Sequence, residues 1–253
     1  MKKIVIDNNR LDDYRDSNII IRDNKIIFNS NGDYTLEYVN SGDINLDIDI
    51  ADNVTIKLFI WSNGNDLKIL NHYKLGYKSN LMLFKFYYNK NVDENVVIDL
   101  NGEYSHLSYN FSSISRGKEE YHIIVNHNHH RVSSNISNKC IGLDNSKIKL
   151  QIDSVLDKGN TLCVMDQNSR ILTLGKVEAT IIPNMFIEED SVEAKHGSIV
   201  GRIAPEEIFY LMSRGITEEE AVTLLIKGFI FSNLVVDMEK RARIFQVIQD
   251  LRR

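Results

Sequence analysis

The chain has 253 residues, of which 43% are hydrophobic and 26% are charged, so it can bury a sizeable core in one large domain, with or without a small appendage. Its formal net charge of -5 argues against a nucleic-acid-binding face, which would be basic, and no apolar run is long enough to span a bilayer. The first residues lack the apolar core of a signal peptide, so we expect a cytoplasmic protein whose two cysteines are reduced.

Short β-strands separated by polar turns are predicted over the first 200 residues. They correspond to runs in which apolar and polar residues alternate, or nearly alternate, at 34–39, 44–50, 54–61, 81–88, 96–100, 120–125, 147–152, 161–165, 171–174 and 179–182. Turn sequences such as SNGD and SGD lie between the first of these runs. No convincing long helix interrupts them, which argues against βαβ units and leaves a sandwich, a barrel or a β-helix.

Several later segments repeat the order strand, polar turn, strand, for example GNTLCVMDQNSRILTL and GKVEATIIPNMFIEEDSVEA. Stacked coils would bury the inward-facing apolar residues of successive turns, as in a β-helix. The repeats are irregular in length, so the pattern favours a β-helix and leaves the other two architectures open.

The pattern becomes helical at Pro205, whose fixed φ suits a first helical turn. Arg214 and Gly215 end this helix, since a cation suits the last turn and glycine accepts a left-handed conformation. We therefore expect a β core at 1–203, almost entirely β from about residue 30, and a helical subdomain at 204–253.

Two further helices are expected in this subdomain. Thr217 begins the second helix, with Glu220 at the capping-box spacing. Its apolar face is expected to consist of Ala221, Leu224, Leu225 and Gly228. The third helix lies in VVDMEKRARIFQVIQDLRR, and its basic residues are expected to form a solvated face, made of Lys240, Arg241 and Arg243.

The residues FYLMSRGITEEEAVTLLIKGF at 209–229 and VEAKHGSIVG at 192–201 resemble the C-terminal signature of the SufB/SufD family, which are scaffold subunits for iron–sulfur cluster assembly. The match is long and ungapped, and it extends more weakly back to about His122. The resemblance implies a mainly β fold, a right-handed parallel β-helix with C-terminal helices. It also implies a SufC-like ABC ATPase as a partner, and pairing of the β-helices in a homodimer or in a heterodimer with a SufB-like paralogue.

His196 is the first candidate ligand, because SufD-like members use a histidine in this AKHG setting to build the nascent cluster or bind iron. With Glu193 it forms the metal-ligand pair that the resemblance implies, for a cluster assembled transiently on the complex. The alternative is a structural histidine. On a strand the two side chains point to opposite faces, so joint ligation requires a bend or a second chain.

The chain departs from the family at one ligand position. SufB-like members carry a cysteine about fifteen residues before the proline that corresponds to Pro183, a thiolate of the kind that iron–sulfur clusters favour. Counting back fifteen residues from Pro183 reaches Asn168, so the cysteine is absent at this position, and Cys163 lies nearby but does not align with it. The chain is therefore closer to SufD at this point. The first hundred residues do not resemble the long N-terminal helical region of many family members, so we expect a minimal or divergent member.

The run HNHH at 127–130 has the composition of a metal-binding tract. On an extended strand His127 and His129 would share one face and His130 would lie on the other, with His122 nearby. We favour an exposed polar coil or turn over a metal site.

The helical subdomain carries the predicted contact with the ATPase. Two short helices cannot bury all of their large apolar side chains against each other, and Arg214 offers a fork of donors to an acidic site. The expected contact residues are Phe209, Tyr210, Leu211, Arg214, Gly215, Ile216 and Phe229. The alternative is that these helices only cap the open end of the β-helix.

The chain is not expected to be an enzyme, because it contains no nucleophile elbow, Walker A loop or dinucleotide fingerprint. Two alternatives to a cluster-assembly scaffold stay open. One is a β-helix enzyme acting on polysaccharide, since such folds carry carboxylates in exposed grooves, but such an enzyme has no reason to possess the helical signature. The other is a degenerate SufD-like structural subunit with no cluster ligands of its own.

Overall fold

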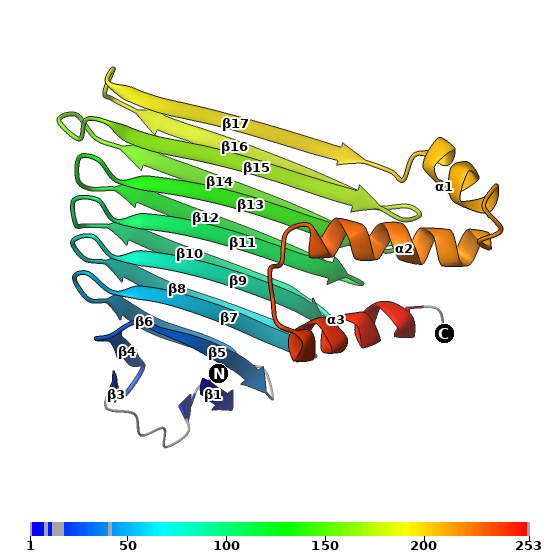
Figure 1. The fold of residues 1–253 in the computed structure, drawn as a ribbon, viewed down its shortest axis with the longest axis horizontal. Helices are drawn as coiled ribbons and strands as arrows, with labels where there is room; N and C mark the ends of the chain where they lie inside the picture. The colour runs from blue at the N-terminus through cyan, green and yellow to red at the C-terminus, as the bar shows by residue number, and fades with distance from the viewer. Residues whose placement is uncertain (1, 8–9, 12–17, 40–41, 252–253) are drawn as a thin grey trace.

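The computed structural model describes residues 2–7, 10–11, 18–39 and 42–251, which form a two-sided parallel β-solenoid followed by helices (Figure 1). Within this part of the chain, nine strands make one sheet, here called sheet A, in the order β17-β15-β13-β11-β9-β7-β5-β1-β2. Eight strands make the facing sheet B, in the order β16-β14-β12-β10-β8-β6-β4-β3. The mainly β fold with a parallel β-helix is therefore confirmed over the sandwich and the barrel.

The strands of sheet A are β1 (Lys2–Asp7), β2 (Arg10–Leu11), β5 (Gly32–Val39), β7 (Thr55–Gly64), β9 (Asn80–Asn89), β11 (His106–Ser115), β13 (Ser133–Gly142), β15 (Cys163–Thr173) and β17 (Val192–Gly201). The strands of sheet B are β3 (Ile19–Arg22), β4 (Lys25–Phe28), β6 (Asp43–Ile50), β8 (Leu67–Leu75), β10 (Val92–Leu100), β12 (Lys118–His127), β14 (Lys147–Leu156) and β16 (Glu178–Ile187). The helices are α1 (Pro205–Met212), α2 (Glu218–Phe231) and α3 (Met238–Asp250).

From β5 to β17 the chain alternates between the two sheets, so each coil adds one strand to sheet A and one to sheet B. Neighbouring strands in these coils are parallel and in register, as in β13 and β15, where Ile136 pairs with Gln167. The strands β1 and β2, and likewise β3 and β4, instead pair antiparallel near the N-terminus. In the coils, a side chain that points inward therefore stacks on the equivalent side chain of the next coil.

The main core lies between the sheets and is built from inward-facing apolar residues, as the alternating sequence pattern predicted. Leu58 and Leu83 are register partners in sheet A, Ile123 and Ile152 are partners in sheet B, and all four are 0% exposed. Full burial of such a side chain contributes about 1.5–3 kcal/mol relative to leaving it in water. Stacking of like residues over many coils thus supplies most of the apolar burial.

The predicted runs at 161–165 and 171–174 are the two ends of a single strand, β15. Between them Gln167 and Ser169 occupy inward positions and are each 1% exposed. Gln167 Nε2 donates to the Ser154 hydroxyl at 2.7 Å, and Ser169 Oγ accepts from Asn138 at 3.0 Å. These inward polar residues interrupt the apolar alternation, so the sequence pattern divided one strand into two. The strands β1 to β4, β8, β11, β13 and β17 also lie outside the predicted runs.

Charged side chains are buried between the sheets as well. Lys85 and Glu94 are both 0% exposed and form an ion pair of 2.8 Å, and Tyr87 donates to the same carboxylate at 2.9 Å. Glu119 is also 0% exposed and accepts a hydrogen bond from Tyr121 at 2.8 Å. Because a buried charge is costly without partners, Lys85 and Glu94 depend on the alignment of β9 with the facing strand β10 of the same coil.

Helices α2 and α3 lie across the outer face of sheet A rather than over the end of the solenoid (Figure 1). Ile230 of α2 and Ile244 of α3 form a second apolar cluster with Trp61 and Phe86 of sheet A. Asn233, between the helices, donates from Nδ2 to the Phe111 carbonyl at 2.7 Å. The alternative that the helices only cap the open end is therefore not met by α2 and α3, because their apolar faces match the aromatic outer face of sheet A.

The helix starts were predicted well and the helix faces less well. The capping box of Thr217 and Glu220 is formed, and Asp237 caps α3. The buried residues of α2 are Ala221, Thr223, Ile226 and Ile230. The predicted apolar face was right at Ala221, whereas Leu224 is 49% exposed and Gly228 is also exposed. None of the helices that the structure describes is long and apolar enough to cross a membrane.

The basic cluster of α3 is not a wholly solvated face, contrary to the prediction. Lys240 is 5% exposed, pairs with Asp237, and lies over the Phe59 ring at 5.3 Å. Arg243 pairs with Glu37 of β5. The aliphatic stems of these residues pack on apolar surface while their charged ends find carboxylates, a use of long cationic side chains that composition alone does not reveal.

Two buried titratable groups give the fold opposite responses to pH. Burial raises the pKa of Glu119 to about 7, so between pH 4.5 and 7 the folded chain holds a proton that the unfolded chain has released. Burial lowers the pKa of His127 to about 4, so between pH 6.5 and 4 the unfolded chain binds a proton at this residue that the folded chain does not bind. Stability from Glu119 is therefore lost as pH rises, and stability from His127 is lost as pH falls.

We predict that Glu119→Gln removes the first of these effects. At about pH 8 the free energy of unfolding should exceed that of the unmodified chain by up to about 3 kcal/mol, and near pH 4.5 the difference should shrink toward zero. Urea denaturation across this pH range measures the change, with Glu120→Gln, at the half-buried, outward-facing neighbour, as the control. An identical pH dependence in Glu119→Gln and the unmodified chain would contradict the assignment.

Candidate functional site

The C-terminal end of the solenoid is an open edge. β17 is the last strand of sheet A and has β15 as its neighbour within the described chain, while β16 ends sheet B. Every residue of β17 is exposed or half-buried, and the side chains of Ile199 and Val200 are 53% and 48% exposed. Figure 1 shows this last coil at the top of the stack, clear of α2 and α3. The edge backbone of a strand in this position is able to pair with another chain.

His196 and Glu193 lie on this edge strand but on different rows of side chains. His196 pairs in register with Gln167, whose side chain is inside the solenoid, so His196 continues an inward row. Glu193 pairs with Val164, which is 40% exposed, so Glu193 continues an outward row. Because alternate residues of a strand face opposite sides, this chain does not bring the two proposed ligands together.

The inward row beneath His196 ends in a polar network. Gln167 Nε2 donates to Ser154 Oγ at 2.7 Å and to the Asn184 carbonyl at 3.2 Å. The side chain of Asn184 instead lies on the outer face of sheet B, where its Nδ2 donates to Asp153 at 2.8 Å. The last coil therefore presents a polar interior at the open end, next to an imidazole that is exposed to solvent.

Asn168, where the resemblance to SufB-like members implies a ligand cysteine, lies on an outward row beside Gly197 of β17. Cys163 is 1% exposed, and its Sγ lies 3.3 Å from the His129 carbonyl. Burial raises the pKa of both the Cys163 and the Cys140 thiols, so both side chains are held in the neutral thiol form.

The histidines of the HNHH run are dispersed over the solenoid. The strand β12 ends at His127, which is buried, donates from Nδ1 to the Val155 carbonyl and binds the Ser134 hydroxyl through Nε2. His129 and His130 lie in the following turn, as the favoured interpretation of a polar coil or turn predicted, whereas His127 is a buried strand residue. Among residues 2–7, 10–11, 18–39 and 42–251, no three His, Cys, Asp or Glu side chains are arranged to hold a metal ion.

His122 is part of a different arrangement, on the outer face of sheet B. Its Nε2 lies 2.6 Å from Asp153 Oδ2, and Asp153 also accepts hydrogen bonds from Gln151 and Asn184. The hydrogen bond from His122 and those from the two amides lower the pKa of Asp153, against the effect of its burial. The imidazole of His122 is thereby tied to its own sheet.

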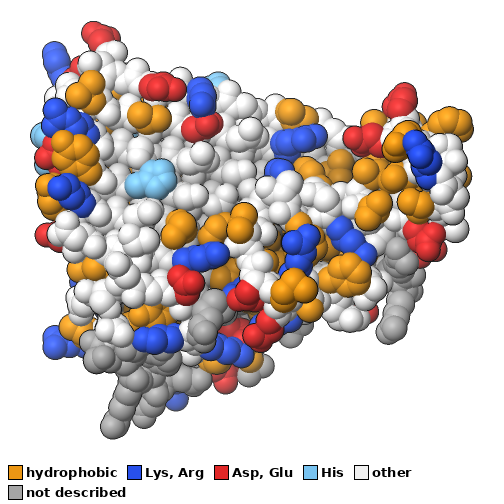
Figure 2. All heavy atoms as spheres, in the orientation of Figure 1, with side chains coloured by type: hydrophobic (Ala, Val, Ile, Leu, Met, Phe, Trp, Pro, Cys, Tyr) orange, Lys and Arg blue, Asp and Glu red, His pale blue; other side chains and the backbone are white. Residues whose placement is uncertain are grey.

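A second exposed feature is the apolar tip formed by α1 and the beginning of α2, which Figure 2 shows at the end of the molecule farthest from the turns of β16 and β17. Phe209, Tyr210 and Met212 of α1 are 73%, 58% and 44% exposed, and Leu224 of α2 is 49% exposed. Arg214 lies over the Tyr210 ring, 5.3 Å from its centroid. These five residues are here called the apolar tip.

The remaining predicted contact residues have other surroundings. Leu211 and Ile216 are half-buried, and Gly215 adopts a φ of +83°, which suits glycine in the turn between the helices. Phe229 is half-buried against sheet A, with Lys139 and Arg170 near its ring at 5.4 and 5.7 Å. The structure thus gathers Phe209, Tyr210 and Arg214 on one exposed surface and turns Phe229 toward the solenoid.

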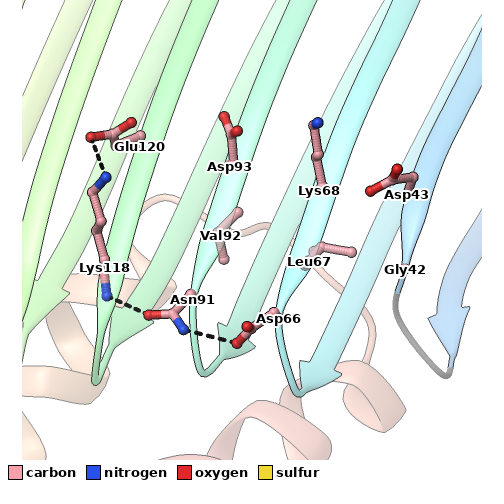
Figure 3. Close-up of a pocket in the computed structure, with 10 residues that line it drawn as sticks. All are labelled: Gly42, Asp43, Asp66, Leu67, Lys68, Asn91, Val92, Asp93, Lys118 and Glu120. Carbon is pink, nitrogen blue, oxygen red and sulfur yellow. Dashed lines mark hydrogen bonds and ion pairs between the residues drawn. The ribbon is translucent and has the colours of Figure 1, made fainter.

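The sequence reasoning missed a shallow trough on the outer face of sheet B (Figure 3). It encloses about 500 Å³ and is lined by Gly42, Asp43, Asp66, Leu67, Lys68, Asn91, Val92, Asp93, Lys118 and Glu120. Asn91 donates to Asp66 at 2.8 Å and accepts from the Lys118 backbone amide at 2.9 Å, and Lys118 pairs with Glu120 at 3.0 Å. This ladder holds successive turns together. The signal in the sequence is the Asp or Asn that directly precedes the apolar starts of β8 and β10.

Comparison with protein families identifies the central and C-terminal part of the chain. Residues 51–229 match the family model described as "SUF system FeS cluster assembly, SufBD core domain". This range runs from the turn before β7 to α2, and so includes the open edge and the apolar tip.

Individual relatives are similar over shorter stretches. The iron–sulfur cluster assembly protein SufD of Bacillus subtilis is 42% identical over 76 residues, which are 30% of this chain and 17% of that protein. An iron–sulfur cluster assembly SufBD family protein of Pyrococcus horikoshii is 32% identical over 98 residues, 37% of this chain and 21% of the relative. A SufBD family protein of Mycobacterium leprae is 41% identical over 86 residues, which are 32% of this chain and 22% of that protein. The chain thus aligns with about a fifth of the length of these relatives.

Proposed function

The chain belongs to the SufBD family of the SUF system for iron–sulfur cluster assembly, and we propose that it acts there as a scaffold subunit together with a SufC-like ABC ATPase. The single observation that carries this proposal is that one match, over residues 51–229, contains both surfaces that the fold leaves for partners. The open edge of β17 supports pairing with another chain, and the apolar tip supports docking of the ATPase.

Pairing through the open edge is the first part of the proposal. Ile199 and Val200 are about half exposed on a strand whose second edge has no neighbour in the described chain. A second copy, or a SufB-like paralogue, placed along this edge would cover both the apolar side chains and the backbone groups. The assembly is then a homodimer or a paralogous heterodimer.

Docking of the ATPase on the apolar tip is the second part. A side chain such as Phe209, 73% exposed on a short helix, contributes little to the stability of its own domain and much to a contact that buries it. Large aromatic side chains of this kind are typical of the residues that dominate binding energy. Arg214 holds Tyr210 by stacking on it and completes the contact surface.

His196 and Glu193 complete the proposal as ligands for nascent iron or a transient cluster. They lie on opposite rows of β17, so a site containing His196 takes its further ligands from the chain that pairs along the same edge. The alternative, a SufD-like subunit that only completes the complex, is favoured by the two cysteines, whose thiols are buried and whose pKa values are raised. Variants of the edge strand distinguish the two.

We predict that a charge on the edge strand prevents pairing. Ile199→Lys should convert the dimer to monomer, because a lysine on an edge strand opposes pairing with a second strand. Multi-angle light scattering of the chain alone and with a SufB-like paralogue measures the assembly. Val235→Lys is the matched control, since Val235 is 68% exposed in the linker between α2 and α3. A monomer from the unmodified chain under both conditions would exclude this interface.

We predict that His196→Ala lowers the iron and sulfide recovered from the anaerobically purified complex by about tenfold or more, as loss of a ligand does. The fold should be unaffected because His196 is exposed. Lys195→Ala, on the outward row of the same strand, should leave the recovery unchanged. Equal recovery from His196→Ala and the unmodified chain would assign His196 a structural role and favour the structural subunit.

We predict that Phe209→Ala weakens binding of the cognate ATPase about 30-fold, the loss of about 2 kcal/mol expected for an aromatic anchor. Arg214→Glu should also weaken binding, because it removes the stacking that positions the Tyr210 ring. Isothermal titration calorimetry measures both, with Met238→Ala as the control, since Met238 is 81% exposed at the start of α3. Unchanged affinity in both tip variants would show that the ATPase binds elsewhere.

A further inference from the structure

The helix α1 has little stability of its own. It contains eight residues, all of them exposed or half-buried, and an isolated helix shorter than about 12–15 residues is marginal in water. Its N-cap residue is Ala204, whose methyl side chain cannot accept a hydrogen bond from the first helical amides. Ile208 and Leu211 are the half-buried residues of α1, which packs against α2. Few contacts therefore hold α1 in place.

The neighbouring helix α2 is built in the opposite way. It has 14 residues, a complete capping box at Thr217 and Glu220, and a face that is buried on sheet A at Ile226 and Ile230. The turn between the two helices includes Gly215 at a φ of +83°, with open space around its Cα. A well-anchored helix is thus joined to a weakly anchored one through a glycine turn.

The charges around the tip indicate what kind of surface stabilises α1. Glu206 and Glu207 are exposed in the first turn of α1, and Glu218 and Glu219 lie in the first turn of α2. Arg214, the cation of the apolar tip, is engaged by the Tyr210 ring. An aromatic surface with an acidic margin is complementary to an apolar groove whose rim carries Lys and Arg.

We propose that α1 is a conditionally folded docking arm, which becomes a stable helix only when Phe209, Tyr210 and Met212 are seated in an apolar groove with a basic rim on a partner protein. This inference rests on the proposed function, in which that partner is the SufC-like ATPase. Folding of α1 on binding then costs free energy, which reduces the affinity for the partner. The affinity of the complex therefore depends on how much of α1 is already helical in the free chain.

Hydrogen–deuterium exchange of the full chain, read by mass spectrometry, tests the first half of the inference. In the free chain the amides of residues 208–212 should exchange at nearly the rate of an unfolded peptide, while those of α2 that face sheet A are protected. Saturation with the ATPase should slow exchange in α1 by about tenfold or more. Protection of α1 in the free chain equal to that of α2 would overturn the inference.

Preorganisation of α1 tests the second half. Ala204→Ser supplies an N-cap hydroxyl without changing the charge, and should tighten binding of the ATPase about fivefold by favouring the helix before contact. Ala242→Ser, at an exposed position of α3, is the matched control and should leave affinity unchanged. Glu206→Lys should weaken binding, and more so at low ionic strength. Equal affinity for Ala204→Ser and the unmodified chain would contradict conditional folding.

The outcomes separate this inference from the proposed function. If the unmodified chain does not bind the ATPase, both fail. If it binds, and Phe209→Ala weakens binding, but α1 is protected beforehand or Ala204→Ser has no effect, docking stands and conditional folding is wrong.

Discussion

Register between successive coils is the constraint on which the rest of this structure depends. Each inward position lies directly on the same position of the next coil and also faces the opposite sheet across the core, so a buried polar group finds its partner in one of these two directions. The Asn138 amide meets its register partner Ser169 one coil away, whereas Lys85 with Glu94, and the Gln167 amide with Ser154, join consecutive strands across the core. A slip of one residue would turn these groups to the outer face and leave apolar residues in water. The polar interior thus fixes the register that the apolar stacks alone would allow to vary.

A stack of this kind has two outer faces and two ends, and the chain covers them unequally. The helices α2 and α3 cover the aromatic part of sheet A, with Asn233 and Arg243 joining them to strands far away in sequence. The outer face of sheet B is polar and is held together by its own ladders, such as Asn91 with Asp66. The last coil and α1 remain exposed, so the available apolar surface is concentrated where β17 ends and the helical subdomain begins.

The sequence predicted the parts of this fold that depend on local chemistry. The alternating strands, the capping box at Thr217 and the change to helix at Pro205 all follow from residues close in the chain. It did not predict features that depend on contacts between distant segments. Inward polar residues interrupt the apolar alternation of β15, so its sequence does not indicate one continuous strand. Lys240 is buried because its ammonium group pairs with Asp237 and lies over the Phe59 ring. Likewise, the sequence does not show that β12 ends at His127, which places His127 in a strand and His129 in the turn that follows. The resemblance indicated His196 and Glu193 as site residues. Only the register of β17 with β15 shows that their side chains lie on opposite faces of the strand.

The two surfaces proposed for partners are close in the chain for a structural reason. β17 ends at Gly201 and α1 begins at Pro205, so three connecting residues, spanning about 10 Å at most, join the edge strand to the docking arm. A partner that orders α1 therefore also restricts the end of the strand that carries His196. Conversely, a chain paired along β17 fixes the point from which α1 departs. The short connection thus allows the two proposed contacts, ATPase docking on α1 and chain pairing along β17, to influence each other.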